Sequence, residues 1–307
     1  MITSGKIIDK INDYYTTLAS IRASKQGVFD DLLKSDNNYV KTLNSLRNLD
    51  LLIAKAHYTN SSKNVIEELE SNKSVLEENL QKIKNGLLKN VGEYKIDYNC
   101  DKCKDTGIIK NKRCSCFYKL LTKYSFDALG INERKFPKFT QTAPQGLEKH
   151  YEVFTSYSKK FPNVDVKNFV FTGTVGSGKT YLAGSICNYL KNKNFLPIFL
   201  TATELNNLFL KIHLSEIDRN LAFEVLLNAD LLVIDDLGTE PTYKNVTNEY
   251  LLTLISERLD KQKAFIITTN LTISEMAKRY NERLISRLSN KKETIFVPFK
   301  GKDLRQE

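Results

Sequence analysis

Residues 168–190, NFVFTGTVGSGKTYLAGSICNYL, constrain the fold of this chain more than any other segment. The pattern predicts a short buried strand, a glycine-rich loop and a helix, and the loop matches G-x-x-x-x-G-K-[ST]. Such a loop turns its backbone N–H groups toward phosphates, and the positive N-terminal end of the following helix strengthens the binding. The segment therefore predicts a nucleotide site formed by Gly173, Thr174, Val175, Gly176, Ser177, Gly178, Lys179 and Thr180.

A second segment, ADLLVIDDLGTE at residues 229–240, predicts a buried strand that ends in two carboxylates. Charged groups seldom end a buried strand without a ligand or a partner. We expect Lys179 to reach the β- and γ-phosphates, and Thr180 and Asp235 to bind Mg²⁺. Asp236 would then polarise the attacking water. The alternative for the two aspartates is a helix cap.

From about residue 165 the chain has five short apolar runs, and helix-length segments separate most of them. The runs are NFVFTG, LPIFLT, LLVIDD, AFIITTN and TIFVPF. This alternation is typical of a largely parallel sheet with helices on both faces. One run, KAFIITTN at residues 263–270, ends in Asn270. An asparagine at this position could be an ordinary turn residue. Because the run follows the glycine loop and the acidic strand, we instead expect Asn270 to contact the γ-phosphate or its attacking water.

Residues 1–90 have apolar side chains at steps of three and four, which predicts amphipathic helices. Polar breaks at residues 34–40 and 58–64 divide the region into two or three helices. The apolar stripes belong either to a plain helical bundle or to a face that binds a partner.

Four of the five cysteines form the pattern Cys-x2-Cys-x10-Cys-x-Cys, with a short hairpin expected between the two pairs. Four thiolates suit tetrahedral Zn²⁺ and leave no open position, so the zinc would be structural. An iron–sulfur cluster and unligated cysteines are the alternatives. The candidate zinc ligands are Cys100, Cys103, Cys114 and Cys116.

The composition, 41% hydrophobic and 27% charged, is typical of a soluble globular protein. We find no apolar run near the ~20 residues of a membrane span and no apolar signal core, so we expect no membrane partner and a cytoplasmic location. The net charge is +10, and residues 100–140 hold ten lysines and arginines against four acidic residues. This excess favours a polyanion or an acidic partner, or forms a solvated basic linker.

The order of GTVGSGKT, LLVIDDLGTE, ITTNLTISEM and RYNERLISRL resembles the AAA+ ATPases, and within them the bacterial helicase loaders of the DnaC/DnaI type. The closing FKGKDLR and the cysteine stretch add to the resemblance, which covers about residues 95–307. It implies an α/β AAA+ P-loop ATPase domain behind an α-helical N-terminal domain with a small zinc module. The expected helical, partner-binding region is residues 1–95, and the zinc module is residues 96–130. A linker at residues 131–150 would then lead into the AAA+ ATPase domain at residues 151–307.

The resemblance also implies roles for three arginines. Arg283 and Arg287 lie where AAA+ proteins carry the arginine that reaches a neighbour's nucleotide, and Arg287 is our choice. Such an arginine is typically worth ~10³–10⁵ in rate and implies self-association. Arg305 resembles the second sensor of these proteins, an arginine that contacts the γ-phosphate bound to its own chain. The alternatives are a surface ion pair for Arg287 and a tail residue for Arg305.

As a function, the resemblance implies an ATP-dependent loader with ATP, Mg²⁺ and Zn²⁺ as cofactors. Its N-terminal region would bind the replicative DnaB-type helicase, and the protein would deliver that helicase onto single-stranded DNA and release it by ATP hydrolysis. Asp236 stands where many AAA+ enzymes carry the longer Glu, so we expect slow, partner-stimulated turnover. The alternatives are a transposition helper ATPase and a zinc-dependent adaptor with a purely structural nucleotide site. A small-molecule kinase is a weaker third.

Overall fold

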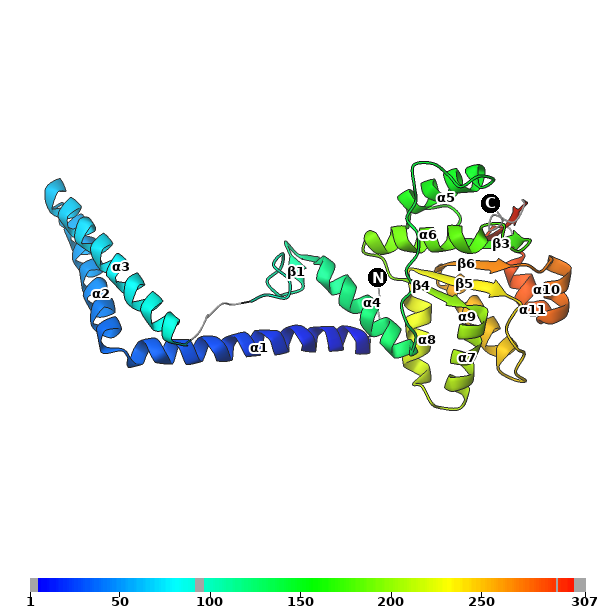
Figure 1. Ribbon diagram of the computed structural model, residues 1–307, viewed down its shortest axis with the longest axis horizontal. Coiled ribbons are helices and arrows are strands. Elements are labelled where there is room, and N and C mark those ends of the chain that lie inside the picture. The colour runs from blue at the N-terminus through cyan, green and yellow to red at the C-terminus, as the bar shows by residue number, and fades with distance from the viewer. Residues whose placement is uncertain (1–4, 92–96, 291, 301–307) are drawn as a thin grey trace. The chain divides into compact units, whose positions relative to one another are not determined.

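The computed structural model describes residues 5–91, 97–290 and 292–300. The chain divides into two compact units, one made of Met1–Asn12 with Gly107–Glu307 and the other of Asp13–Thr106. Figure 1 shows the helices and strands of both. No helix within these described ranges is long and apolar enough to cross a membrane.

Three long helices fill the N-terminal region, as predicted: α1 (Gly5–Ser35), α2 (Asn37–Tyr58) and α3 (Lys63–Val91). Both polar segments break the helices as expected. At the first, the Asp36 carboxylate accepts the Tyr39 N–H at 2.7 Å and caps α2. Helices α2 and α3 form a hairpin, in which Lys73 pairs with Asp50 at 2.8 Å.

The first turns of α1 belong to the larger unit. Ile7 and Ile11 are 1% and 0% exposed, and the ammonium group of Lys6 lies 2.8 Å from the Asp218 carboxylate. The Gly5 N–H also donates to Glu224 on α8 (Arg219–Asn228). Burial of both isoleucines therefore fastens the start of α1 to the α/β unit.

The expected hairpin between the cysteine pairs is present. Strands β1 (Ile108–Ile109) and β2 (Lys112–Arg113) are antiparallel, and the two turn residues between them have positive φ angles of 45° and 63°. Helix α4 (Ser115–Leu129) follows and ends at Gly130 in the left-handed conformation. Residues 131–146 then form no helix or strand, as their composition predicts.

The five apolar runs form one sheet in the order β4-β5-β6-β3-β7, with every neighbouring pair parallel. This confirms the predicted α/β class with a parallel sheet. The strand ranges are β3 (Asn168–Gly173), β4 (Pro197–Thr201), β5 (Leu231–Leu237), β6 (Ala264–Thr269) and β7 (Thr294–Phe299).

Helices cover both faces of the sheet (Figure 1). One face carries α5 (Glu148–Lys160) and α6 (Lys179–Asn192), packed over an aromatic core that includes Phe154, Phe169 and Phe171. The other face carries α7 (Ala202–His213), α8 and α9 (Thr247–Asp260). Two short helices complete the unit: α10 (Ile273–Arg279) and α11 (Glu282–Leu288). The buried sheet thus fixes where β3, β5 and β6 end, and these ends carry the predicted site.

Candidate nucleotide site and cysteine cluster

Two glycines of the loop are required by close packing of the protein on itself. A Cβ at Gly173, whose φ is 148°, would lie 2.2 Å from the carbonyl oxygen of Phe299 on β7. A Cβ at Gly178, whose φ is 86°, would lie 2.5 Å from a Leu147 methyl group. Both positions therefore need glycine even before a phosphate is considered.

Lys179 starts α6, and its side chain is 4% exposed. Its ammonium group donates to the carbonyl oxygens of Gly173 at 2.8 Å and Thr174 at 2.7 Å. It also donates to Asn270 Oδ1 at the end of β6, at 2.9 Å. The structure therefore brings together the predicted phosphate lysine and the predicted sensor, which lie 91 residues apart.

Asp235 is 3% exposed at the end of β5, and two hydroxyl groups donate to its Oδ1. One is the predicted magnesium partner Thr180, at 2.9 Å, and the other is Thr268 on β6, at 2.7 Å. Burial raises the pKa of the Asp235 carboxyl above its ordinary value, and the two hydroxyl donors oppose that rise. Thr268 was missed from sequence, because a threonine inside an apolar run looks like an ordinary strand residue.

Asp236 has a left-handed backbone with φ of 56°, and its N–H donates to the Thr268 hydroxyl at 2.9 Å. This turn places Asp236 on the wall of a cavity of about 410 Å³ beside the loop. Pro144 and Leu147 also line it, and nothing in their sequence context marks them as site residues. The remaining lining residues are Val175, Gly176, Ser177, Gly178, Lys179, Thr180, Tyr181 and Asn270.

This arrangement fits a nucleoside triphosphate with Mg²⁺. The loop glycines Gly176 and Gly178 adopt positive φ angles, as a loop that curls around phosphates requires. A buried lysine supplies positive charge, and a hydroxyl group and a carboxylate stand together as oxygen ligands of the kind Mg²⁺ prefers. Apolar walls at Pro144 and Leu147 offer surface for a base.

The predicted arginines lie elsewhere. Arg283 and Arg287 line a separate open cleft of about 520 Å³ between α9 and α11, and neither lines the nucleotide cavity. Arg287 pairs with Asp260 at 3.2 Å, and both side chains are about half exposed. An exposed ion pair of this kind is weak, so Arg287 is available to another partner. Arg305 lies outside the described residues.

The four predicted zinc ligands come together. Their sulfur atoms all lie within 4.8 Å of one another, and Cys103 and Cys114 are buried. Tetrahedral zinc with Zn–S bonds of about 2.3 Å needs sulfurs about 3.8 Å apart, so the cluster fits the ion. The carboxylate of Asp105 accepts the Cys100 N–H at 2.7 Å and the Arg22 guanidinium at 2.8 Å, which orders the first cysteine pair.

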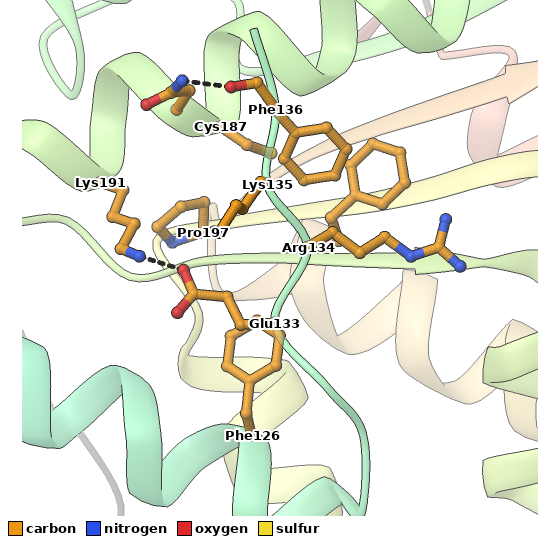
Figure 2. Close-up of a pocket in the computed structure, with 10 residues that line it drawn as sticks. Phe126, Glu133, Arg134, Lys135, Phe136, Cys187, Lys191 and Pro197 are labelled. Carbon is orange, nitrogen blue, oxygen red and sulfur yellow. Dashed lines mark hydrogen bonds and ion pairs between the residues drawn. The ribbon is translucent and has the colours of Figure 1, made fainter.

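A second cavity, of about 340 Å³, lies beside the linker and contains none of the predicted site residues (Figure 2). Glu133 pairs with Lys191 at its rim, and the ring of Phe136 packs so closely on α6 that a Cβ at Gly184 would lie 2.4 Å away. The linker is therefore docked on the α/β unit. The lining residues are Phe126, Glu133, Arg134, Lys135, Phe136, Cys187, Asn188, Lys191, Pro197 and Phe199.

Comparison with known proteins supports the nucleotide site. Residues 149–289 match the family described as IstB-like ATP binding protein. The replicative helicase loader DnaC of Escherichia coli K12 is 28% identical over 127 residues, which is 40% of this chain and 51% of that protein. DnaC of Buchnera aphidicola (subsp. Acyrthosiphon pisum, strain APS) is 28% identical over 147 residues, or 47% and 58%. The chain spans about half the length of the curated relatives it matches, and the resemblance to helicase loaders is confirmed over that part.

Solved structures with a similar fold include those of DnaC and DnaI. The crystal structure of the DnaC helicase loader is 23% identical with a TM-score of 0.44, and covers 57% of this chain and 99% of that one. The crystal structure of DnaI is 17% identical with a TM-score of 0.45, and covers 59% of this chain and 93% of that one.

Proposed function

We propose that this protein is an ATP-dependent loader that binds the replicative helicase in the cytoplasm and delivers it onto single-stranded DNA. One observation carries the proposal. A nucleotide site in which Lys179, Thr180, Asp235 and Asn270 meet stands in a region related to proteins named replicative helicase loader DnaC. Similarity to an ATP-binding family supports ATP binding by this chain. Loading of the helicase, its release and slow ATP turnover are our inference.

The residues of the site divide the work of phosphoryl transfer. Lys179 would exchange its bonds to the loop carbonyls for bonds to the β- and γ-phosphates, and Thr180 and Asp235 would hold Mg²⁺. Bound Mg²⁺ would neutralise charge that develops on the phosphate oxygens. Asp236, on the cavity wall, would orient the attacking water, and Asn270 would sense the γ-phosphate.

Hydrolysis would be completed by a second copy of the chain. Arg287 is surface-exposed and does not line its own nucleotide cavity, so it is placed to serve a neighbour's site. Arg283, four residues earlier on the same face of this short helix, is the second candidate for that role. Such a trans arginine makes turnover depend on assembly, which suits a release switch.

The helical unit Asp13–Thr106 is the proposed helicase-binding region. Large apolar side chains are exposed on all three helices of this unit, and we infer that those of α2 contact the helicase. A structural zinc on the four cysteines would stabilise the module that follows the helices. The exposed apolar residues are Ile21, Val28, Leu51, Leu52, Tyr58, Val65 and Val75.

Two alternatives share parts of this description. A transposition helper ATPase would have the same AAA+ core, and the family match at residues 149–289 lies within that shared core. The cysteine cluster and the likeness to DnaC favour the loader. A zinc-dependent adaptor would bind ATP without hydrolysing it. Asp235 beside Thr180, Asp236 on the cavity wall and the exposed Arg287 favour an ATPase.

A binding experiment tests the helicase partner. The full-length double variant Leu51→Glu and Leu52→Glu places charge on two exposed side chains of α2, which are 69% and 52% exposed. We expect affinity for the host's replicative helicase to fall by about 30-fold, the effect of losing one binding hot spot. Val153→Glu, at a 58% exposed position on α5, is the matched control and should bind normally. Equal loss in both variants, or in neither, would contradict the proposed region.

A further inference from the structure

Glu240 is a buried carboxylate that the nucleotide site does not use. It lies four residues after Asp236, is 3% exposed, and does not line the nucleotide cavity. Burying a charge is costly unless it is paired and hydrogen-bonded. The partners of Glu240 should therefore show what the carboxylate is for.

One oxygen of Glu240 faces the strand end that carries Asp236. Its Oε2 accepts the Gly238 N–H at 2.8 Å. In the same turn, the Thr239 hydroxyl and N–H both donate to the carbonyl oxygen of Asp236, at 2.9 Å and 3.2 Å. A Cβ at Gly238, whose φ is 111°, would lie 2.6 Å from a Leu271 methyl group, so the turn is packed against the end of β6.

The other oxygen faces the connection between α10 and α11. The Tyr280 hydroxyl donates to Glu240 Oε1, and Arg279 Nε lies 3.7 Å from the same atom. Arg279 also donates to the Glu240 carbonyl oxygen. Tyr280 is 4% exposed, and burial together with Glu240 raises its pKa, so the hydroxyl keeps its proton and remains a donor.

These contacts fix the start of the arginine helix. Tyr280 immediately precedes Asn281, whose side chain accepts the Leu284 N–H at 2.8 Å and caps α11. Helix α11 is only seven residues long and carries Arg283 and Arg287. Since so short a helix gains little stability from its own hydrogen bonds, its orientation depends on tertiary contacts. These are the burial of Leu284 and Leu288 along the helix and the bonds of Glu240 to the connection just before it.

We propose that Glu240 is a positioning residue that holds α11 so that Arg287 meets the nucleotide of a neighbouring subunit. This inference rests on the proposed function, because it takes Arg287 as the trans arginine. Glutamate suits the position because its carboxylate accepts hydrogen bonds from Gly238 on one side and Tyr280 on the other. Its negative charge also pairs with Arg279. Glutamine keeps the shape but loses the charge that faces the guanidinium.

The bond to Gly238 offers a competing route, in which Glu240 acts on Asp236 of its own site. Mixed assemblies separate the two routes. A Glu240→Gln chain keeps its nucleotide site. A Lys179→Ala chain presents a normal α11 but stays without nucleotide at ATP concentrations that fill only the Glu240→Gln site. If Glu240 acts through the arginine, the second chain repairs the first. If Glu240 acts on its own Asp236, mixing repairs nothing.

ATP turnover of the full-length chains is the measurement. We expect E240Q to bind ATP as the wild type does and to turn it over about tenfold more slowly, since a misplaced catalytic group commonly costs one to two orders of magnitude. Mixing E240Q with K179A should restore turnover to the level reached by mixing R287A with K179A. Glu152→Gln, an exposed carboxylate on α5, is the control for charge loss and should behave as wild type.

The outcomes are distinguishable. Recovery in the R287A mixture but not in the E240Q mixture overturns the role of Glu240. No recovery in the R287A mixture overturns the trans role of Arg287, which belongs to the proposed function. Amide hydrogen exchange then tests Glu240 separately: E240Q should raise exchange across residues 280–288 and leave β3 unchanged. Unchanged exchange at residues 280–288 would overturn the inference whatever the turnover.

Discussion

The nucleotide site and the cysteine cluster differ in what holds their side chains in place. Lys179, at the start of α6, donates hydrogen bonds to backbone carbonyls, and Asp235, near the end of β5, accepts one from Thr268. Both lie at the edge of a sheet whose faces are covered by helices. The cysteine module has strands of only two residues each. Among described residues 97–114, the buried ones are Cys103, Asp105, Gly107 and Cys114.

This difference shows that a large apolar core can build a site before its ligand arrives, whereas a small module needs its ligand as a core. The nucleotide site should therefore survive the loss of its ligand. The cysteine module should not survive the loss of zinc. Substitutions at each site test this contrast.

Replacing one zinc ligand should disrupt the cysteine module and spare the nucleotide site. Zinc binding in model peptides is worth about 10–16 kcal/mol, so losing one ligand of four in Cys103→Ser should lower zinc affinity by about 300-fold. ATP affinity should change less than twofold. Elemental analysis measures the zinc retained by the purified protein, and titration calorimetry measures the affinities for zinc and for ATP. Cys187→Ala, which removes the cysteine outside the cluster, should retain zinc, and equal zinc loss in both variants would contradict the assignment.

Lys179→Ala should produce the converse result. It removes the ammonium group expected to bind the phosphates, and charge-assisted hydrogen bonds of this kind are worth about 1.5–3 kcal/mol. ATP affinity should fall by about 100-fold, while zinc remains at one ion per chain. Titration calorimetry with ATP measures the first, and elemental analysis the second. An affinity within a few-fold of wild type would show that the buried lysine serves only the fold.

Asp235→Asn should have a smaller effect, on stability. Because burial raises the pKa of Asp235, its ionised form is less stable in the folded chain than in the unfolded one at neutral pH. Asparagine keeps an oxygen for Thr180 and Thr268 and removes that cost. The melting temperature of the nucleotide-free protein should rise by about 2–4 °C, the usual effect of one stabilising substitution in a domain of this size.

The pH dependence gives the sign of that effect. Above the raised pKa the Asp235 carboxylate is charged, and burying that charge lowers the stability of the folded protein by its full amount. As the pH falls through that pKa the wild type takes up a proton, so the difference in melting temperature between wild type and D235N should narrow. Thermal melts at several pH values measure it. A difference that grows toward acid pH would mean that Asp235 is stabilised as an anion.

Most of the fold could be predicted because its signals are local. The five apolar runs became the five strands within a residue or two, and the polar breaks became Asp36 and the turn before Lys63. The site residues of the glycine loop and the acidic strand were equally visible, because their motifs are contiguous.

What sequence could not predict depends on contacts between distant segments. Thr268 and Glu240 act through partners 33 and 40 residues away, and neither has a local signature. The basic excess around the cysteines is partly structural. Arg113 lies over the Phe117 ring at 4.4 Å, and Arg134 pairs with Glu204 at 2.7 Å. Both arginines thus have partners within the chain, which a count of charges does not reveal.

Under the proposed function, this protein loads the replicative helicase onto DNA. The most direct measurement is the amount of the host's replicative helicase retained on circular single-stranded DNA after incubation with ATP, with and without this protein. We expect several-fold more retained helicase with the wild-type chain, and no increase with the Leu51→Glu, Leu52→Glu variant. Equal retention with and without the wild-type chain would contradict the account.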